Sequence, residues 1–225
     1  MKILIVSATF SEIRYLYEQT QLISKHDDYL SSHRYNDNDI DILITGVGMT
    51  TTAYQLGLAA SKTNYDVAFN FGIAGSFDRE INIGEVVNVV EDVVSELGGE
   101  NAGLFMKFDD LIIDKKSVEK TIWQVKNYRI YLNAVTGILR RVKGITVNTV
   151  HGNDESIKKV IQLFHPDVET MEGAAFLYFC RDRKIKSAQI RCISNYVESR
   201  NTALWNIKLA IENLNKTAIE ILNTL

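Results

Sequence analysis

Two glutamates, Glu169 and Glu172, stand at the start of the apolar stretch VETMEGAAFLYFC, which begins like a β-strand and continues like a buried helix. Burying a carboxylate is strongly unfavourable unless another group pairs with it. At the start of a helix, a carboxylate interacts favourably with the helix dipole, or it accepts hydrogen bonds from a bound hydroxyl group. The spacing alone favours the structural role, and Glu169, two residues before Met171, is interpreted as a structural or rim carboxylate.

Glycine-containing turns follow two strand-like runs, in TGVGMTTTAYQLG and in FNFGIAGSF. In the first, a strand–turn–helix can present free N–H groups to an anion or hydroxyl. The dinucleotide fingerprint is absent, because Thr51 stands where a third glycine should follow Gly46 and Gly48. In the second, Gly72 and Gly75 allow the backbone to approach another group closely, or they mark a bend in the sheet. A ligand site at these turns and a purely structural role are both left open.

The elements that must position these residues alternate between strand and helix. Runs rich in β-branched residues predict strands at 2–8, 39–48, 65–75, 84–94, 144–152 and 187–197. Apolar residues at helical spacing predict helices at 11–25, 50–62, 154–164, 171–183 and 203–225. Several strands are apolar on both faces, which indicates a covered parallel or mixed sheet of the α/β class. We expect one domain over residues 1–225.

Local signals indicate where some elements begin and end. Asp154 is a candidate N-cap, whereas a helix beginning at Ser11 lacks the glutamate of a capping box. Pro166 and the glycine pair at 98–99 predict loops. Residues 98–117 are the least regular part of the chain and are interpreted as a surface loop.

The composition is that of an ordinary globular protein, with 46% hydrophobic residues and a formal net charge of −3. This charge disfavours a nucleic-acid partner, which would require a basic surface. No apolar run is long enough to predict a membrane span. The two cysteines, Cys180 and Cys192, lie in apolar runs without metal-ligand spacing. We therefore expect neither a metal nor a disulfide, and a cytoplasmic protein.

The motifs GVGMTTTAYQLG, FNFGIAGSF, INIGEVVNVVEDVVSE, ETMEGAAFLYFC and QIRCISNYVESR resemble those of the nucleoside phosphorylase/nucleosidase superfamily, in the same order. The resemblance covers nearly the whole chain apart from residues 98–140. It implies a three-layer α/β/α sandwich around a mixed central sheet, cleavage of an N-ribosidic bond without a cofactor or metal, and a homodimer. The partner it implies is a small-molecule purine nucleoside.

The same resemblance assigns roles to particular positions. Glu12 matches the glutamate that positions the water, Met171 and Glu172 match the pair beneath the ribose, and Asn195 matches the base-recognition residue. The remaining substrate-binding positions that it implies are Ile73, Ala74, Gly75, Thr149 and Val150.

These residue types suit the chemistry. Cleavage passes through an oxocarbenium-like sugar, which a carboxylate at Glu172 would stabilise while it accepts from the ribose hydroxyls. Glu12 would act as the general base or orienter of water. Asn195 stands where relatives that act on adenine nucleosides usually carry aspartate. An amide donates and accepts but is not an acid, so it favours a 6-oxopurine such as hypoxanthine.

Charged and aromatic residues bear on the identity of the nucleophile and of the group at the ribose 5′ position. A phosphorylase needs cationic groups for phosphate, and SATFSE and FGIAGSF contain none, which favours water. The ending ISNYVESRN…W is similar to that of the futalosine hydrolases. Their benzoate-bearing substrate could use a cation and an aromatic wall, for which the candidates are Arg14, Arg200, Phe77, Tyr196 and Trp205. A methylthioadenosine/S-adenosylhomocysteine nucleosidase, a nucleoside phosphorylase and a non-catalytic nucleoside-binding module remain alternatives.

Overall fold

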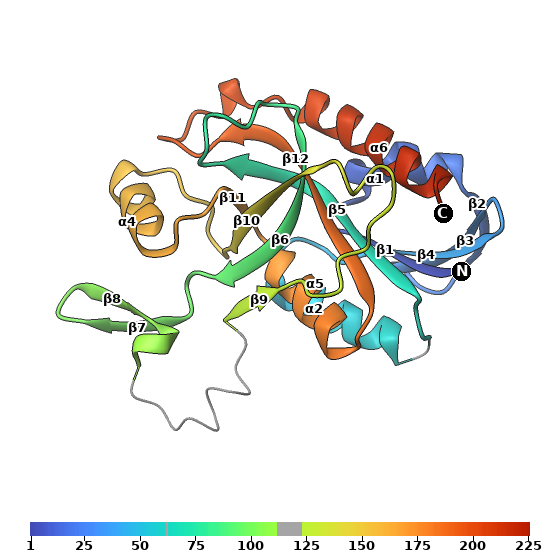
Figure 1. The fold of residues 1–225 in the computed structure, drawn as a ribbon, viewed down its shortest axis with the longest axis horizontal. Helices are drawn as coiled ribbons and strands as arrows, with labels where there is room; N and C mark the ends of the chain where they lie inside the picture. Colours follow the sequence, from blue (N-terminus) through green and yellow to red (C-terminus); the bar gives the residue numbers. More distant parts are fainter. Residues whose placement is uncertain (62, 112–122) are drawn as a thin grey trace.

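The computed structural model describes residues 1–61, 63–111 and 123–225. Strands and helices alternate along most of the chain (Figure 1). The strands are β1 (Lys2–Ser7), β2 (Gln21–Lys25), β3 (Leu30–Tyr35), β4 (Asn38–Ile44), β5 (Val67–Ser76), β6 (Val86–Val94), β7 (Gly98–Asn101), β8 (Leu104–Lys107), β9 (Gln124–Lys126), β10 (Arg140–Thr146), β11 (Val168–Thr170) and β12 (Lys186–Tyr196). The helices are α1 (Phe10–Gln19), α2 (Met49–Ala60), α4 (Asp154–Phe164), α5 (Gly173–Asp182) and α6 (Ile207–Asn223), with 3-10 turns η1 (Phe108–Asp110) and η2 (Thr202–Leu204).

A large mixed sheet has the strand order β11-β10-β6-β12-β5-β1-β4-β3-β2, and β9 pairs with β6. At its centre β1, β4, β5 and β12 run parallel, whereas β6 is antiparallel to β12. Strand β11 is parallel to β10 and antiparallel to β5, so it joins the end of the sheet back to its middle. The predicted mixed sheet is therefore confirmed.

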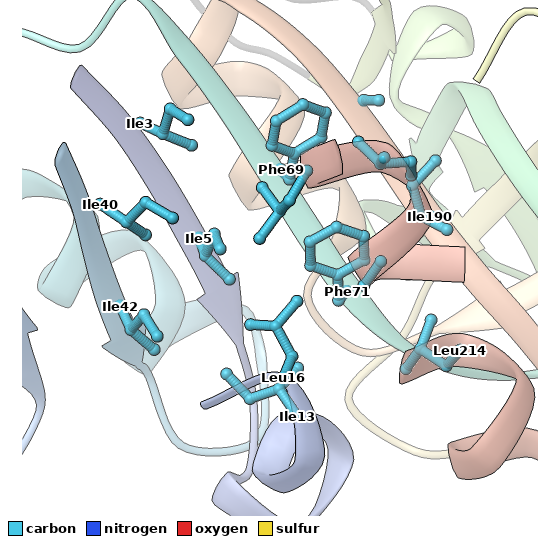
Figure 2. Packing of buried hydrophobic residues seen from close by; sticks show 14 of the residues in the cluster. Ile3, Ile5, Ile13, Leu16, Ile40, Ile42, Phe69, Phe71, Ile190 and Leu214 are labelled. Atoms are coloured by element: carbon cyan, nitrogen blue, oxygen red, sulfur yellow. The ribbon is translucent and has the colours of Figure 1, made fainter. Parts of the chain in front are cut away.

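Helices cover both faces of this sheet, with α1 and α6 on one side and α2 and α5 on the other (Figure 1). Because successive residues of a strand point to opposite faces, β1 contributes to both cores. Ile3 and Ile5 pack in the cluster under α1 and α6 (Figure 2), while Leu4 and Val6 pack under α2 and α5. This arrangement confirms the expected three-layer α/β/α sandwich and explains why the strand is apolar throughout.

The predicted helix at 11–25 is wrong over its second half. Helix α1 ends at Gln19, and the following segment forms the edge strand β2 paired with β3. The side chain of Thr20 bonds to the backbone oxygen of Tyr17 and to the His33 ring across the pair. The helix also begins earlier than predicted, with a capping box between Thr9 and Glu12. Hairpin pairing with the next strand, β3, overrides the local helical periodicity here.

The strand predicted at 144–152 is also misplaced, because β10 ends at Thr146. Beyond it, the N–H groups of Asn148 and Thr149 bond to the carboxylate of Glu96, and that of His151 bonds to Glu169. These carboxylates satisfy N–H groups that a continuing strand would have paired with its neighbour. The segment turns out of the sheet as a result.

Other local predictions have mixed outcomes. Helix α4 has the predicted bounds and Pro166 lies in a loop, but the N-cap is Asn153 rather than Asp154. The predicted loop at 98–117 is wrong for 98–107, which form the β7–β8 hairpin. Residues 112–117 lie outside the described residues.

Both cysteines are buried, with free thiols. Among the described residues, no helix is sufficiently long and apolar to cross a membrane.

Candidate functional site

A cavity of about 310 Å³ opens where β1, β5, β11 and β12 end. In α/β sheets, ligands bind beyond the carboxyl ends of the strands. Eight predicted site residues line this cavity, namely Glu12, Ile73, Ala74, Gly75, Val150, Met171, Glu172 and Asn195. Thr149 is not among the lining residues. It is exposed, and its N–H bonds to Glu96.

Glu12 lies in the first turn of α1 and both of its carboxylate oxygens are anchored. Oε2 accepts from the Thr9 N–H (3.0 Å), the Thr9 hydroxyl (2.9 Å) and the Ser7 hydroxyl (3.3 Å). Oε1 accepts from the N–H of Ile73, 3.1 Å away on β5. Oε1 keeps acceptor capacity, because a carboxylate oxygen takes about two hydrogen bonds. The side chain therefore serves as a helix cap and also presents one oxygen at the cavity wall.

Glu172 immediately precedes α5, yet its side chain does not cap that helix. Its Oε1 accepts from the N–H of Gly48, 3.0 Å away at the start of α2. Gly48 has φ +104, a backbone conformation that is unfavourable for residues with a side chain. Glycine at this position therefore allows the turn to direct its N–H at the carboxylate. Burial is the main cause that raises the pKa of Glu172 above its usual value, against the lowering effect of Arg191. Thus the turn binds an anion, and the anion is the protein's own side chain.

Arg191, on β12, is the buried cation behind the cavity and the functional residue that sequence reasoning missed. It is 1% exposed, and its Nη2 lies 3.9 Å from Oε2 of Glu172. The guanidinium also bonds to the side chain and carbonyl of Asn70. Gly72 makes room for it, since a Cβ there would lie 3.0 Å from Nη1. The sequence signal for this residue was a lone arginine within the apolar run QIRCIS. A buried arginine is almost always paired, so its presence there indicated a nearby acidic partner.

A second buried polar cluster forms hydrogen bonds at the start of α5. Asp92 accepts from Thr146 (2.7 Å) and Gln189 (3.0 Å), while the Thr146 hydroxyl accepts from the N–H of Ala174 (2.8 Å). Complete burial raises the pKa of Asp92 to about 6. The cluster holds the helix turn that carries Glu172 in place, without lining the cavity.

Asn195 lies at the end of β12 and faces the cavity with a partly satisfied amide. Its Oδ1 accepts from the Ser194 hydroxyl at 2.7 Å, and its Nδ2 donates to the Tyr196 carbonyl at 3.0 Å. One N–H and one acceptor position are left for a ligand. The side chain packs over Gly75, where a Cβ would lie 3.2 Å from Nδ2. The glycine therefore permits the close approach of this amide, which is one of the two roles left open for the turn.

Glu169 and His151 form a further pair in the cavity wall. Glu169 is 5% exposed and its Oε2 bonds to Nδ1 of His151. Both side chains line the cavity. The prediction that Glu169 is a structural or rim carboxylate therefore did not include its pairing with His151. No local signal could have paired them, because the contact depends on how the segment after β10 meets β11.

The residues considered for the group at the ribose 5′ position are divided between the cavity and the surface. Trp205 lines the cavity, and the guanidinium carbon of Arg200 lies 5.2 Å from its ring centroid. Tyr196 is instead covered by Arg79, and Phe77 packs against a core cluster and, edge to face, against the ring of His151. Arg14 lies over Phe10 at 5.6 Å. Of this set, the cavity brings together Trp205 and, behind it, Arg200.

Comparison with known proteins agrees with this architecture. Futalosine hydrolase of Thermus thermophilus is 27% identical over 192 residues, covering 80% of each chain. The 5′-methylthioadenosine/S-adenosylhomocysteine nucleosidase of Colwellia psychrerythraea is 27% identical over 202 residues, covering 84% of this chain and 80% of that protein. The adenine-bound structure of a nucleosidase of that name from the same organism has a TM-score of 0.80 at 20% identity. It covers 100% of this chain and 96% of the other, and it shares the fold.

The two curated relatives are named as nucleosidases, which are N-glycosyl hydrolases. A family model described as the phosphorylase superfamily matches residues 2–225, and the chain belongs to that superfamily.

Proposed function

We propose that this enzyme hydrolyses the N-ribosidic bond of a purine nucleoside, with water as the nucleophile. The observation that carries the proposal is the convergence of Glu12 and Glu172 on one cavity, with Arg191 buried behind them. Two carboxylates and one guanidinium leave the site with an excess of negative charge. That excess favours a sugar that becomes cationic as the bond to the base breaks.

The anchoring of each carboxylate supports a separate task. Glu12 keeps an acceptor position on Oε1, with which it would hold a water molecule and take its proton. Glu172 has free acceptor capacity beyond its bond to Gly48, with which it would grip the ribose hydroxyls. Met171, at the same wall, would contact the sugar face through its polarisable thioether.

Water is favoured over phosphate by the charges around the cavity. Among the described residues, those lining it include Glu12, Glu169 and Glu172 but no lysine or arginine. Arg191 lies behind the wall and faces both Glu12 and Glu172. A phosphate dianion would meet uncompensated negative charge there, whereas phosphate sites in proteins present cationic donors.

For the substrate we favour futalosine, with hypoxanthine as the leaving base and a place in menaquinone biosynthesis. Asn195 supports a 6-oxopurine, since its free N–H can donate to the oxo group. Trp205 and Arg200 would supply an aromatic wall and a cation for the benzoate. The Colwellia relative supports methylthioadenosine or S-adenosylhomocysteine as the second candidate, because its identity to this chain equals that of the futalosine hydrolase.

The test is incubation of the purified protein with futalosine, methylthioadenosine and inosine, each with and without phosphate, with the released base measured by chromatography. We expect hypoxanthine from futalosine at a rate that is independent of phosphate. Faster release of adenine from methylthioadenosine would contradict the role of Asn195. Reaction of inosine only in the presence of phosphate would establish a phosphorylase, and binding without turnover would establish a nucleoside-binding module.

We also propose that the enzyme is a homodimer that forms through the outer face of α2 and α5. Val47, Tyr54, Leu58 and Tyr178 are exposed there by 55%, 64%, 45% and 42%. Helix α2 packs on α5, so these side chains extend over neighbouring helices, and Val47 also borders the cavity. Sedimentation velocity should give twice the 25.5 kDa chain mass, and Tyr54→Glu should give the monomer. A wild-type monomer would refute the proposal.

A further inference from the structure

The pair formed by His151 and Glu169 has no role in the mechanism derived above. Oε2 of Glu169 bonds to Nδ1 of His151, and Oε1 accepts from the backbone N–H of the same residue at 3.0 Å. The carboxylate therefore fixes both the ring and the backbone that carries it. Among the described residues none bonds to Nε2 of His151, so this ring nitrogen is available to a ligand.

The sheet register places this pair beside the proposed base site. Gly75 of β5 is aligned with Glu169 of β11 on one side and with Asn195 of β12 on the other. All three residues and His151 line the same cavity. Val150, which precedes His151, is also in the wall, so the pair and the Asn195 amide flank the same end of the cavity.

The chemistry at that end requires a proton donor. A purine leaves ribose with the electrons of the C1′–N9 bond, and protonation of a ring nitrogen makes it a much better leaving group. An amide such as Asn195 does not release a proton, whereas an imidazolium does so near neutral pH. A carboxylate bonded to Nδ1 fixes the orientation of the ring and leaves Nε2–H directed away from it.

We propose that His151, oriented by Glu169, is the general acid that protonates the departing purine. This assignment rests on the proposed nucleosidase function. As the C1′–N9 bond breaks, its electron pair moves onto the base, and the Nε2 proton of His151 is transferred to a ring nitrogen. Water adds its oxygen to C1′ and gives a proton to Glu12. Proton exchange with solvent then restores the imidazolium and the carboxylate, and one water is consumed in each cycle.

The experiment compares two leaving groups in the intact enzyme. His151→Asn should lower kcat on the purine nucleoside by about 10²–10³-fold, the usual contribution of a general acid. On 4-nitrophenyl riboside, whose phenolate leaves without a proton, the same variant should stay within about threefold of wild type. Asparagine retains a donor for Glu169, which protects the fold, and thermal melting checks this directly.

The matched control is His165→Asn, which makes the same change at an exposed helix C-cap. His165 has φ +47, a conformation that asparagine adopts readily, so both activities should be unchanged. Glu169→Gln provides the second measurement. The substitution removes the carboxylate that orients the His151 ring, so kcat on the purine nucleoside should fall, while turnover of 4-nitrophenyl riboside should stay within about threefold of wild type.

Three results would overturn the assignment. Equal losses on both substrates would give His151 a structural or binding role, and unchanged kcat on the purine would give it none. Unchanged kcat on the purine nucleoside in Glu169→Gln would show that this carboxylate does not orient a proton donor. Failure of wild type to cleave any purine nucleoside is a different outcome, which rejects the proposed function itself.

Discussion

Glu172→Gln should reduce kcat/KM by about 10³-fold while the protein remains folded, because the substitution removes a charge aimed at the developing cation. The glutamine carbonyl can still accept the N–H of Gly48, which lies 3.0 Å from the native Oε1. The ribose contacts are therefore weakened less than the electrostatic stabilisation. The loss should be mainly in kcat, measured by release of the base under saturating substrate.

The pKa of Glu172 adds a dependence on pH to this prediction. Burial raises the pKa of the carboxyl, so the ionised form costs folding free energy at neutral pH and protonates at a higher pH than a free glutamate. As the pH is lowered, wild-type activity should consequently be lost at a higher pH than it would be if the essential glutamate were exposed. The melting temperature of Glu172→Gln should be at least that of wild type, since the neutral amide removes the cost of the buried charge.

Glu220→Gln is the matched control, an exposed glutamate on α6, and should leave both turnover and melting unchanged. Wild-type turnover in Glu172→Gln would mean that the carboxylate only holds the turn at Gly48. It would then be structural, as the spacing of the sequence alone favoured.

Glu12→Gln should lower kcat by about 10²–10³-fold, because an amide cannot accept the proton of the attacking water. Glutamine at this position retains the capping box with Thr9, since glutamine serves as well as glutamate in that motif. Its single carbonyl oxygen takes over the Thr9 contacts, so the helix should begin at the same place. The N–H of Ile73 then loses its acceptor, so the expected result is an inactive, folded enzyme that melts somewhat below wild type.

A second substitution separates the chemical role of Glu12 from its role as a cap. Glu12→Ala removes both, and loss of a helix cap costs about 1 kcal/mol of folding free energy. Glu12→Ala and Glu12→Gln should be equally inactive, but Glu12→Ala should also melt at lower temperature. If Glu12→Gln were active and only Glu12→Ala were impaired, the residue would be a cap and the general base would lie elsewhere.

The α/β class could be predicted because burial leaves a periodic trace in the sequence. The run KILIVS places apolar residues on both faces of its strand, and each face packs against a different helical layer. The segment 154–164 repeats apolar residues at helical spacing and forms α4 with those bounds. Periods of two and 3.6 residues arise from local backbone geometry, so they are visible without knowledge of the partners.

Prediction failed where a group outside the segment determined the backbone conformation. The segment QLISK continues a helical pattern, yet pairing with β3 makes it an edge strand. Residues after Thr146 are rich in strand formers, but the carboxylates of Glu96 and Glu169 take their N–H groups. The hairpin partner of QLISK is nearby in the sequence, whereas the Glu96 and Glu169 contacts join more distant residues; neither kind of hydrogen bond leaves a local period.

By itself, the sequence determined the layered fold and, through its resemblance to a family, eight of the residues that line the cavity. Only the tertiary structure decided how their charges are arranged. It places Arg191 behind Glu172, directs the Gly48 N–H at that carboxylate, and brings His151 onto Glu169. The physical reason is that residue types set what a side chain can donate or accept, whereas its charge state and partners depend on which strand ends meet.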